Sequence, residues 1–222
     1  MNTDGIPQEL LGTPAPWDDL AQEEALPPMP GLEFVNHAYC LKLLQARREL
    51  EGLLLFLKAI KPSNILEIGT LTGATFFCWC QVATGKKISI DLPGGMGGVS
   101  YTQHHMELRN ARMSAWSEDV HCFLGSSRDL DIVRGVRDLL DGERLDFLFI
   151  DGDHQYEHVK RDFELYSPMV RDGGIVAFHD VENCEYHPNY GVLAGKFWKE
   201  LCGDQLRLTS ERMWGGIGVL FV

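Results

Sequence analysis

The chain has 222 residues, of which 45% are hydrophobic and 23% charged, so it can form one sizeable core and has the composition of a globular domain. Its formal net charge of −12 argues against a nucleic-acid backbone as a partner, because there is no excess of Lys and Arg to displace counterions. No apolar run reaches membrane-spanning length, and the acidic N-terminus is unlike a signal peptide, so no membrane partner is expected.

Six cysteines are spread along the chain without a C-x-x-C pair or the spacing of a zinc finger. Four of them lie among apolar residues, where a reduced cysteine behaves as a small hydrophobic side chain. We therefore predict reduced thiols and a cytoplasmic protein, because disulfides persist mainly in oxidising compartments.

The N-terminal region differs from the rest of the chain. Residues 1–31 contain six prolines, which preclude a continuous helix and predict a flexible arm ahead of one domain over residues 32–222. From about residue 34 to residue 60, leucines recur at three- and four-residue steps, which predicts helical structure. Pro62 ends that pattern, and "NILEIG" at residues 64–69 is typical of a short buried strand.

Beyond this strand, strand patterns and helical patterns alternate. The predicted strands are Lys87–Asp91, Val120–Gly125, Asp146–Asp151 and Gly174–Asp180, with helices over residues 72–83, 102–114, 129–140 and 156–170. Apolar strands separated by helices indicate a parallel sheet covered on both faces, and hence an α/β fold. One more helix, over residues 192–201, precedes "QLRLTS" and "GGIGVLFV", which are close enough in sequence to form an antiparallel pair.

In such folds ligands bind at the carboxyl ends of the strands, where the strand order reverses. The polar residues that end the predicted strands are therefore the candidate site residues. They are Glu67–Gly73, Asp91, Gly125–Ser127, Asp151–His154 and His179–Asp180.

The loop "LEIGTLTGATFF" follows the first strand and lacks the G-x-G-x-x-G pattern of dinucleotide-binding folds. A carboxylate at Glu67 suits a ligand that carries an ammonium group better than a pyrophosphate, which needs bare amides. Asp91, at the end of the second strand, is placed to accept hydrogen bonds from ribose hydroxyls. The alternative is a tight strand-to-helix turn with an acidic residue beside it.

Three stretches together, "ILEIGTLTGATF", "ISIDL" and "GGIVAFHD", resemble the class I S-adenosylmethionine-dependent methyltransferases over roughly residues 49–222. The resemblance implies a Rossmann-like three-layer sandwich, with a mostly parallel seven-stranded sheet and an antiparallel last strand. It also implies that the first glycine loop, the acid after the second strand and the loop after the third strand hold S-adenosylmethionine. Carried over by position, the cofactor-binding residues are Glu67, Gly69, Thr70, Gly73, Asp91, Gly125, Ser126 and Asp151.

Asp151 and Asp180 end two strands that we expect to be neighbours, about 5 Å apart. An aliphatic hydroxyl has a pKa of roughly 15 to 16, so ionising it at pH 7 costs about 11 to 12 kcal/mol. A general base typically contributes a factor of only about 10²–10⁴, whereas a divalent cation stabilises the alkoxide directly. The two carboxylates are the oxygen ligands that Mg²⁺ prefers, so a cation between them is predicted.

The pattern "DGD" followed by a later pair, here "HD", resembles the metal-dependent small-molecule O-methyltransferases of the catechol, caffeoyl-CoA and antibiotic-sugar types. The resemblance implies Asp151, His179 and Asp180 as metal ligands and Asp153 as a base or a supporting residue. The histidine departs from the pattern, because imidazole binds Mg²⁺ poorly and suits Mn²⁺ better. His154 and His179 are further candidates for the catalytic base, since imidazole titrates near neutral pH. The alternatives are that "DGDH" only caps the next helix and that His179 only packs at the edge of the core.

The sequence therefore predicts an S-adenosylmethionine-dependent O-methyltransferase that uses a divalent cation, Mg²⁺ or alternatively Mn²⁺, and acts on a hydroxyl of a small molecule such as a sugar or a phenol. Two alternatives of the same fold stay open, a metal-independent methyltransferase and a binding module without catalysis. A nicotinamide-dependent oxidoreductase is a third, disfavoured by the missing G-x-G-x-x-G pattern. Small-molecule partners are expected, and a homo-oligomer is left open.

Overall fold

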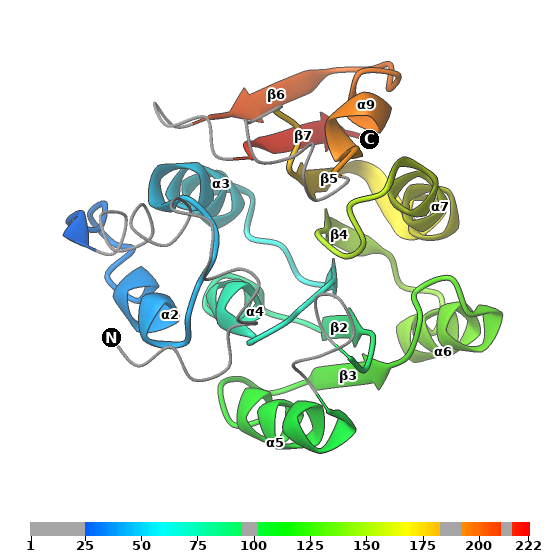
Figure 1. The fold of residues 1–222 in the computed structure, drawn as a ribbon, viewed down its shortest axis with the longest axis horizontal. Helices are drawn as coiled ribbons and strands as arrows, with labels where there is room; N and C mark the ends of the chain where they lie inside the picture. The colour runs from blue at the N-terminus through cyan, green and yellow to red at the C-terminus, as the bar shows by residue number, and fades with distance from the viewer. Residues whose placement is uncertain (1–24, 95–101, 183–191, 210–214) are drawn as a thin grey trace, which may run out of the picture.

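The computed structural model describes residues 25–94, 102–182, 192–209 and 215–222, so most of the predicted arm over residues 1–31 lies outside the described residues. Helices and strands alternate along the chain (Figure 1). In chain order they are α2 (Val35–Cys40), α3 (Arg47–Ile60), β1 (Ile65–Ile68), α4 (Ala74–Cys80), β2 (Lys87–Asp91), α5 (Gln103–Met113), β3 (Val120–Leu124), α6 (Leu130–Leu140), β4 (Leu145–Ile150), α7 (Tyr156–Tyr166), the 3₁₀ turn η3 (Ser167–Met169), β5 (Val170–His179), α9 (Ala194–Trp198), β6 (Gln205–Leu208) and β7 (Ile217–Phe221).

The strands form one seven-stranded sheet in the order β3-β2-β1-β4-β5-β7-β6. Neighbours from β3 to β5 pair in parallel, whereas β7 is antiparallel to both β5 and β6. The predicted fold class is therefore confirmed, as is the pairing of the fourth and fifth strands. The strand order reverses between β1 and β4, which makes the carboxyl ends of these strands the expected place for a ligand.

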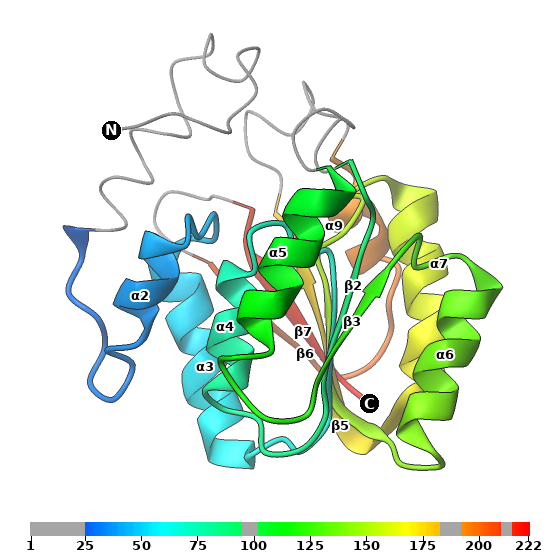
Figure 2. The same ribbon diagram turned by 90° about the horizontal axis from the view of Figure 1, so that it is seen from below.

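Helices cover both faces of the sheet. In Figure 2, α3, α4 and α5 lie on one side of the strands and α6 and α7 on the other. Side chains alternate across each strand, so Phe147 and Phe149 of β4 join the core under α3 and α4. Leu148 and Ile150 join the second core, under α6 and α7. This is the three-layer sandwich that the sequence predicts.

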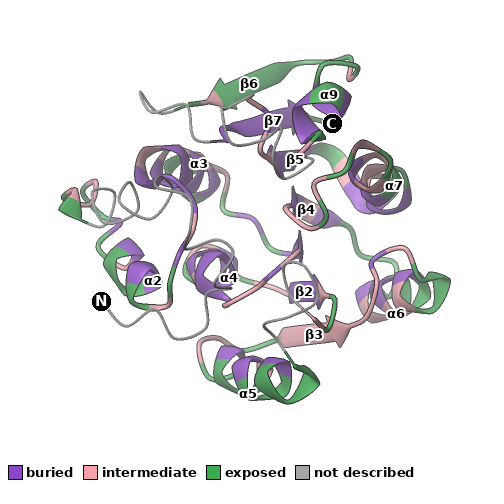
Figure 3. Cartoon of the chain, in the orientation of Figure 1, coloured by how far each residue is buried: buried purple, intermediate pink, exposed green. Residues whose placement is uncertain are grey.

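Burial is deepest in the middle of the sheet and decreases toward its edges (Figure 3). All four residues of β1 are buried, whereas β3 is half-buried and β6 is largely exposed. Among the described residues, no helix has both the length and the apolar character needed to cross a membrane.

The helical pattern predicted over residues 34–60 is divided in the structure between two helices, α2 and α3, which are separated by residues 41–46. Lys42 in this break has a φ of 64°, a left-handed conformation that a continuous α-helix cannot contain. Leu43 is buried in the break, so the apolar spacing continues across it although the helix does not. The break also places Gln45 near the carboxyl ends of the strands, as described below.

Candidate functional site

The loop after β1 passes directly against the loop after β4. Gly69, Leu71 and Gly73 all have positive φ, of 87°, 45° and 86°. A Cβ on Gly69 would lie 2.1 Å from the main-chain oxygen of Asp151, so only glycine fits there. The backbone N–H of Asp151 also donates to Ile68 O over 2.9 Å. The first glycine loop and the start of the "DGDH" loop are therefore held together by their backbones.

Glu67 lies in the core and not on the face of this loop. Its side chain is fully buried, and its Oε1 accepts a 2.8 Å hydrogen bond from Trp79 Nε1. Burial raises the pKa of Glu67 to about 8, with a further contribution from the nearby charge of Asp151. Burial thus favours the neutral form of Glu67, and its side chain faces the core, whereas the sequence suggested a charged carboxylate for an ammonium group.

Thr70, another predicted cofactor residue, also points into the protein. Its Oγ1 lies 2.6 Å from Ser89 Oγ on β2, and the side chain is buried. The backbone turn around Thr70, and not its hydroxyl, is what faces the end of the sheet. Gly73 is the N-cap of α4, and a Cβ there would come within 3.2 Å of Met113 and Trp116.

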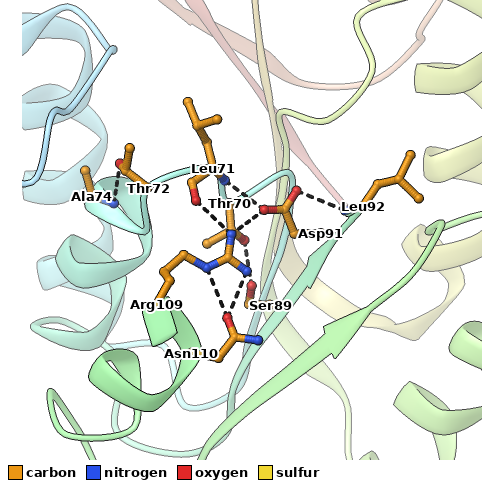
Figure 4. Close-up of polar contacts among 9 residues, drawn as sticks. All are labelled: Thr70, Leu71, Thr72, Ala74, Ser89, Asp91, Leu92, Arg109 and Asn110. Carbon is orange, nitrogen blue, oxygen red and sulfur yellow. Dashed lines mark hydrogen bonds and ion pairs between the residues drawn. The ribbon is translucent and has the colours of Figure 1, made fainter. Parts of the chain in front are cut away.

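Asp91 is held by a dense set of donors at the end of β2 (Figure 4). Its Oδ2 accepts hydrogen bonds from Arg109 Nη1 and from the backbone N–H of Leu71, the latter over 3.0 Å. Its Oδ1 accepts from the backbone N–H of Leu92 over 3.0 Å. Arg109 comes from α5 and is almost fully buried. The acid predicted to bind ribose therefore has a buried guanidinium as its neighbour.

The loop after β3, which contains the predicted residues Gly125 and Ser126, lies beside Asp91. The backbone N–H of Gly125 donates to Asp91 O over 3.0 Å. Below this loop, Ser127 Oγ donates to Asp162 Oδ1 over 2.6 Å, and burial raises the pKa of Asp162 to about 6. The structure thus brings together Gly69, Gly73, Asp91 and Gly125 around the ends of β1, β2 and β3.

Four titratable residues meet at the carboxyl ends of β4 and β5: Asp151, His154, His179 and Asp180. We call them the carboxylate–imidazole cluster. His179 Nδ1 lies 3.2 Å from Asp151 Oδ1 and 3.3 Å from Asp180 Oδ1, and His154 Nδ1 lies 3.1 Å from Asp180 Oδ2. The side chain of His154 is 28% exposed, against 10% for His179, so His154 is the more accessible imidazole.

His179 is arranged as a proton donor. With carboxylate oxygens on either side of Nδ1, that nitrogen must carry a hydrogen, and its Nε2 is buried without a hydrogen-bond partner among the described residues. Burial by itself would lower the pKa of His179, but the charges of Asp151 and Asp180 together raise it well above its usual value. The predicted role of His179 as a base is therefore poorly matched to this geometry.

Asp153, the other predicted base, lies outside the cluster. Its Oδ2 pairs with His158 Nδ1, and its Oδ1 accepts the backbone N–H of Gln155 over 3.2 Å. The side chain is 41% exposed, and Arg128 Nη1 lies 3.9 Å from Oδ2. Asp153 thus shapes the turn ahead of α7, but it is not the N-cap that the capping alternative suggested, since the N-cap is Gln155.

Two residues of the site carry no signal in the sequence. Gln45 Nε2 donates to Asp151 Oδ2 over 2.7 Å, and Gln45 Oε1 accepts from Thr75 Oγ1 over 3.2 Å. Arg109 is the other. Both lie on segments with an ordinary helical pattern, and neither is near a predicted strand end.

A divalent cation was predicted between Asp151, His179 and Asp180. These side chains do meet, but His179 Nδ1 occupies the space between the two carboxylates and faces them as a donor. Across the described ranges, no three His, Cys, Asp or Glu side chains are arranged to hold a metal ion. This arrangement does not fit a three-ligand metal centre.

An open cleft of about 450 Å³ lies at α9, lined in the described part of the chain by Val192, Leu193, Lys196, Lys199 and Glu200. The backbone N–H of Leu193 donates to His154 O over 2.8 Å, which ties the cleft to the "DGDH" loop.

Comparison with known proteins agrees with this geometry. Residues 66–181, just over half of the chain, match the family described as Methyltransferase domain. An uncharacterized protein of Acanthamoeba polyphaga mimivirus is 48% identical over 123 residues, which are 55% of this chain and 53% of that protein. The chain spans about half the length, or less, of the curated relatives it matches.

Solved structures with the same fold include two O-methyltransferases. The O-methyltransferase from Bacillus cereus in complex with SAH has a TM-score of 0.62 at 19% identity, covering 93% of this chain and 97% of that one. TomG from Streptomyces achromogenes, an O-methyltransferase involved in tomaymycin synthesis and solved with SAM, has a TM-score of 0.62 at 18% identity, covering 93% and 96%.

Proposed function

Because the chain belongs to the Methyltransferase domain family, we propose that the protein transfers a methyl group from S-adenosylmethionine to a hydroxyl of a small molecule. The position of the glycine loop supports binding of this cofactor, since it follows β1, where the strand order reverses and ligands bind in such folds. Asp91 lies at the end of β2, where it can accept a hydrogen bond from a ribose hydroxyl; among the described residues its Oδ1 has only the backbone N–H of Leu92 as a donor. TomG, which shares the fold, is an O-methyltransferase involved in tomaymycin synthesis, and this favours oxygen as the atom that is methylated.

The observation that carries the proposal is the position of the carboxylate–imidazole cluster. The backbone contact between Gly69 and Asp151 places the cluster directly beside the loop that would hold the cofactor. A proton acceptor is needed there, because a neutral hydroxyl is a weak nucleophile. The cluster thus combines a cofactor loop with groups that can move a proton.

His154 is the proposed general base. Asp180 Oδ2, 3.1 Å from His154 Nδ1, holds the hydrogen on that nitrogen and leaves Nε2 as the acceptor. S-adenosylmethionine supplies the methyl carbon, whose bond to sulfur breaks as the hydroxyl oxygen bonds to it. The hydroxyl proton passes to His154 Nε2, and the sulfonium becomes a neutral thioether, so charge and atoms balance. His179 keeps its proton and offsets the charge of Asp151 and Asp180.

A matched pair of histidine variants tests this proposal. We expect His154→Gln to lower kcat by about 10²–10⁴-fold in a mass-spectrometric assay of methyl transfer to a panel of catechols and sugars. The affinity for S-adenosylhomocysteine, measured by calorimetry, should stay within about threefold, because Gln replaces a group that does not hold the cofactor. His158→Gln is the control, since His158 pairs with Asp153 outside the cluster. Equal kcat in the two variants would rule out His154 as the base.

The finer predictions are tested with the same assay. Metal assistance stays a prediction, favoured by the convergence of Asp151 and Asp180 and opposed by the position of His179. If methyl transfer is unchanged after dialysis against a chelator and is not raised by Mg²⁺ or Mn²⁺, the metal-independent alternative holds. Calorimetric binding of NAD in place of S-adenosylhomocysteine would instead favour an oxidoreductase.

A further inference from the structure

Nitrogen atoms of the chain face the carboxylate oxygens that a divalent cation would need. On Asp151, Oδ1 lies 3.2 Å from His179 Nδ1 and Oδ2 accepts from Gln45 Nε2 over 2.7 Å. On Asp180, Oδ1 lies 3.3 Å from His179 Nδ1 and Oδ2 lies 3.1 Å from His154 Nδ1. A nitrogen this close to a carboxylate oxygen carries a hydrogen, because two bare acceptors would repel each other. All four oxygens therefore face N–H donors.

Gln45 is fixed in the orientation that presents its amide nitrogen to Asp151. Its side-chain oxygen accepts from Thr75 Oγ1 over 3.2 Å, and its backbone oxygen accepts from Tyr39 OH over 3.1 Å. The residue is buried. A rotation that turned the amide oxygen toward a cation would break the bond from Thr75 and remove the donor from Asp151 Oδ2. This oxygen is thus covered by a side chain that is itself anchored on two sides.

His179 lacks the support that a metal-binding histidine needs. Its Nδ1 could bind a metal only after losing its hydrogen, and the hydrogen of the neutral ring would then be on Nε2. A histidine that binds a metal almost always donates its other ring N–H to a carboxylate, a carbonyl or a water molecule. In His179, Nε2 is buried and has no hydrogen-bond partner among the described residues. The ring has its partners at Nδ1, where it faces Asp151 and Asp180 as a donor.

We propose that His179 keeps divalent cations out of the carboxylate–imidazole cluster, which acts as a metal-free centre with donors from Gln45, His154 and His179. This role rests on the proposed function for the catalytic part that the cluster plays, and it goes against the cation expected from the sequence. An aspartate in place of His179 would bring a third carboxylate to Asp151 and Asp180. Such a set of oxygens is what Mg²⁺ and Mn²⁺ prefer, so this one substitution should admit a cation.

The test is a titration of the protein with Mn²⁺, followed by the electron paramagnetic resonance signal of the free ion. Mn²⁺ accepts imidazole as well as carboxylate ligands, so it is a favourable probe for the wild type. The wild type and Asp151→Asn should bind Mn²⁺ within about threefold of each other, through weak association with an acidic surface. His179→Asp should gain a site at least about tenfold tighter, which His179→Asp combined with Asp151→Asn should lose. His158→Asp is the control and should gain none, because it adds a carboxylate beside Asp153, outside the cluster.

A Mn²⁺ site in the wild type that Asp151→Asn removes would overturn the inference, as would a folded His179→Asp that binds Mn²⁺ no more tightly than the wild type. His179→Asn is a second variant in case His179→Asp does not fold. It supplies an oxygen without a third negative charge and should gain a weaker site. The titrations are repeated with saturating S-adenosylhomocysteine, so that a cation bound together with the cofactor is also detected. Failure of the wild type to bind S-adenosylhomocysteine would overturn the proposed function and leave the Mn²⁺ result standing.

Discussion

The two halves of the site balance their carboxylates with different partners. At the ends of β1 and β2, Asp91 is paired with the buried guanidinium of Arg109, which cannot give up its proton in a protein. At the ends of β4 and β5, Asp151 and Asp180 are paired with imidazoles, a type of side chain that can give up a proton. The first half is thus suited to hold a ligand in one orientation, and the second half is suited to proton transfer.

Gly69 is the point where the two halves touch, and Gly69→Ala is expected to have the largest effect. The new Cβ would lie 2.1 Å from Asp151 O, at a φ of 87°. Because backbone would have to move, the free energy of unfolding should fall by about 4–5 kcal/mol, measured by urea denaturation. Gly142→Ala is the matched control, with a φ of 84° and no atom within 4 Å, and should cost only about 1 kcal/mol. Equal losses would show that the two halves can separate at little cost.

Asp180→Asn tests whether the second half works through a carboxylate–imidazole pair. Asn tolerates the positive φ of 59° at this position, so the backbone can stay in place. The amide cannot hold His154 in the required tautomer reliably, so we expect kcat to fall by about 10²–10³-fold, or about 3–4 kcal/mol. Asp172→Asn, at the exposed opposite end of β5, is the control. A matching loss of affinity for S-adenosylhomocysteine would place Asp180 in cofactor binding instead.

The fold could be predicted because its strands are apolar and its helices are regularly spaced between them. The closing pair β6 and β7 was evident from the short distance between the two strands in the sequence. The break between α2 and α3 was missed because buried leucines lie on both sides of it, and apolar spacing does not register a left-handed residue such as Lys42.

The site was predictable only in part, for a related reason. A strand end shows where Asp91, Asp151 and Asp180 lie, but not which side chains from helices meet them. Arg109 lies 18 residues from Asp91, and Gln45 lies 106 residues from Asp151. The sequence pattern also did not indicate the raised pKa of Glu67. Because β1 is buried on both faces, the side chain of Glu67 lies in the core on either face of the sheet.

Glu67 lies between the two halves of the site, and its pKa depends on a carboxylate from each half. Burial raises the pKa of Glu67 to about 8 from 4.5, and the charges of Asp151 and Asp91 add to the rise. Between pH 4.5 and 8 the unfolded chain loses this proton and the native chain keeps it, so this group makes stability fall as pH rises. Glu67→Gln removes that fall, and at pH 7 it should be more stable than the wild type by about 3 kcal/mol.

The measurement is the difference in unfolding free energy between Glu67→Gln and the wild type at a series of pH values. It should be small near pH 4 and grow toward pH 8. Glu107→Gln, an exposed position on α5, should show no such growth. A difference that stays constant with pH would mean that Glu67 is ionised in the folded protein, and its predicted role toward an ammonium group would then regain support.

Gln45→Leu should have the smallest effect on kcat. It tests how much the hydrogen bond that supports the carboxylate matters in the second half of the site. Gln45 gives Asp151 a neutral 2.7 Å hydrogen bond, whereas Arg109 gives Asp91 a full opposite charge. With His179 still in place beside Asp151, we expect kcat to fall by only about tenfold. Gln81→Leu, an exposed glutamine on the same side of the sheet, should leave kcat unchanged. A loss as large as that of Asp180→Asn would mean that the amide, and not the imidazole, sets the position of Asp151, and the second half would then be as rigidly built as the first.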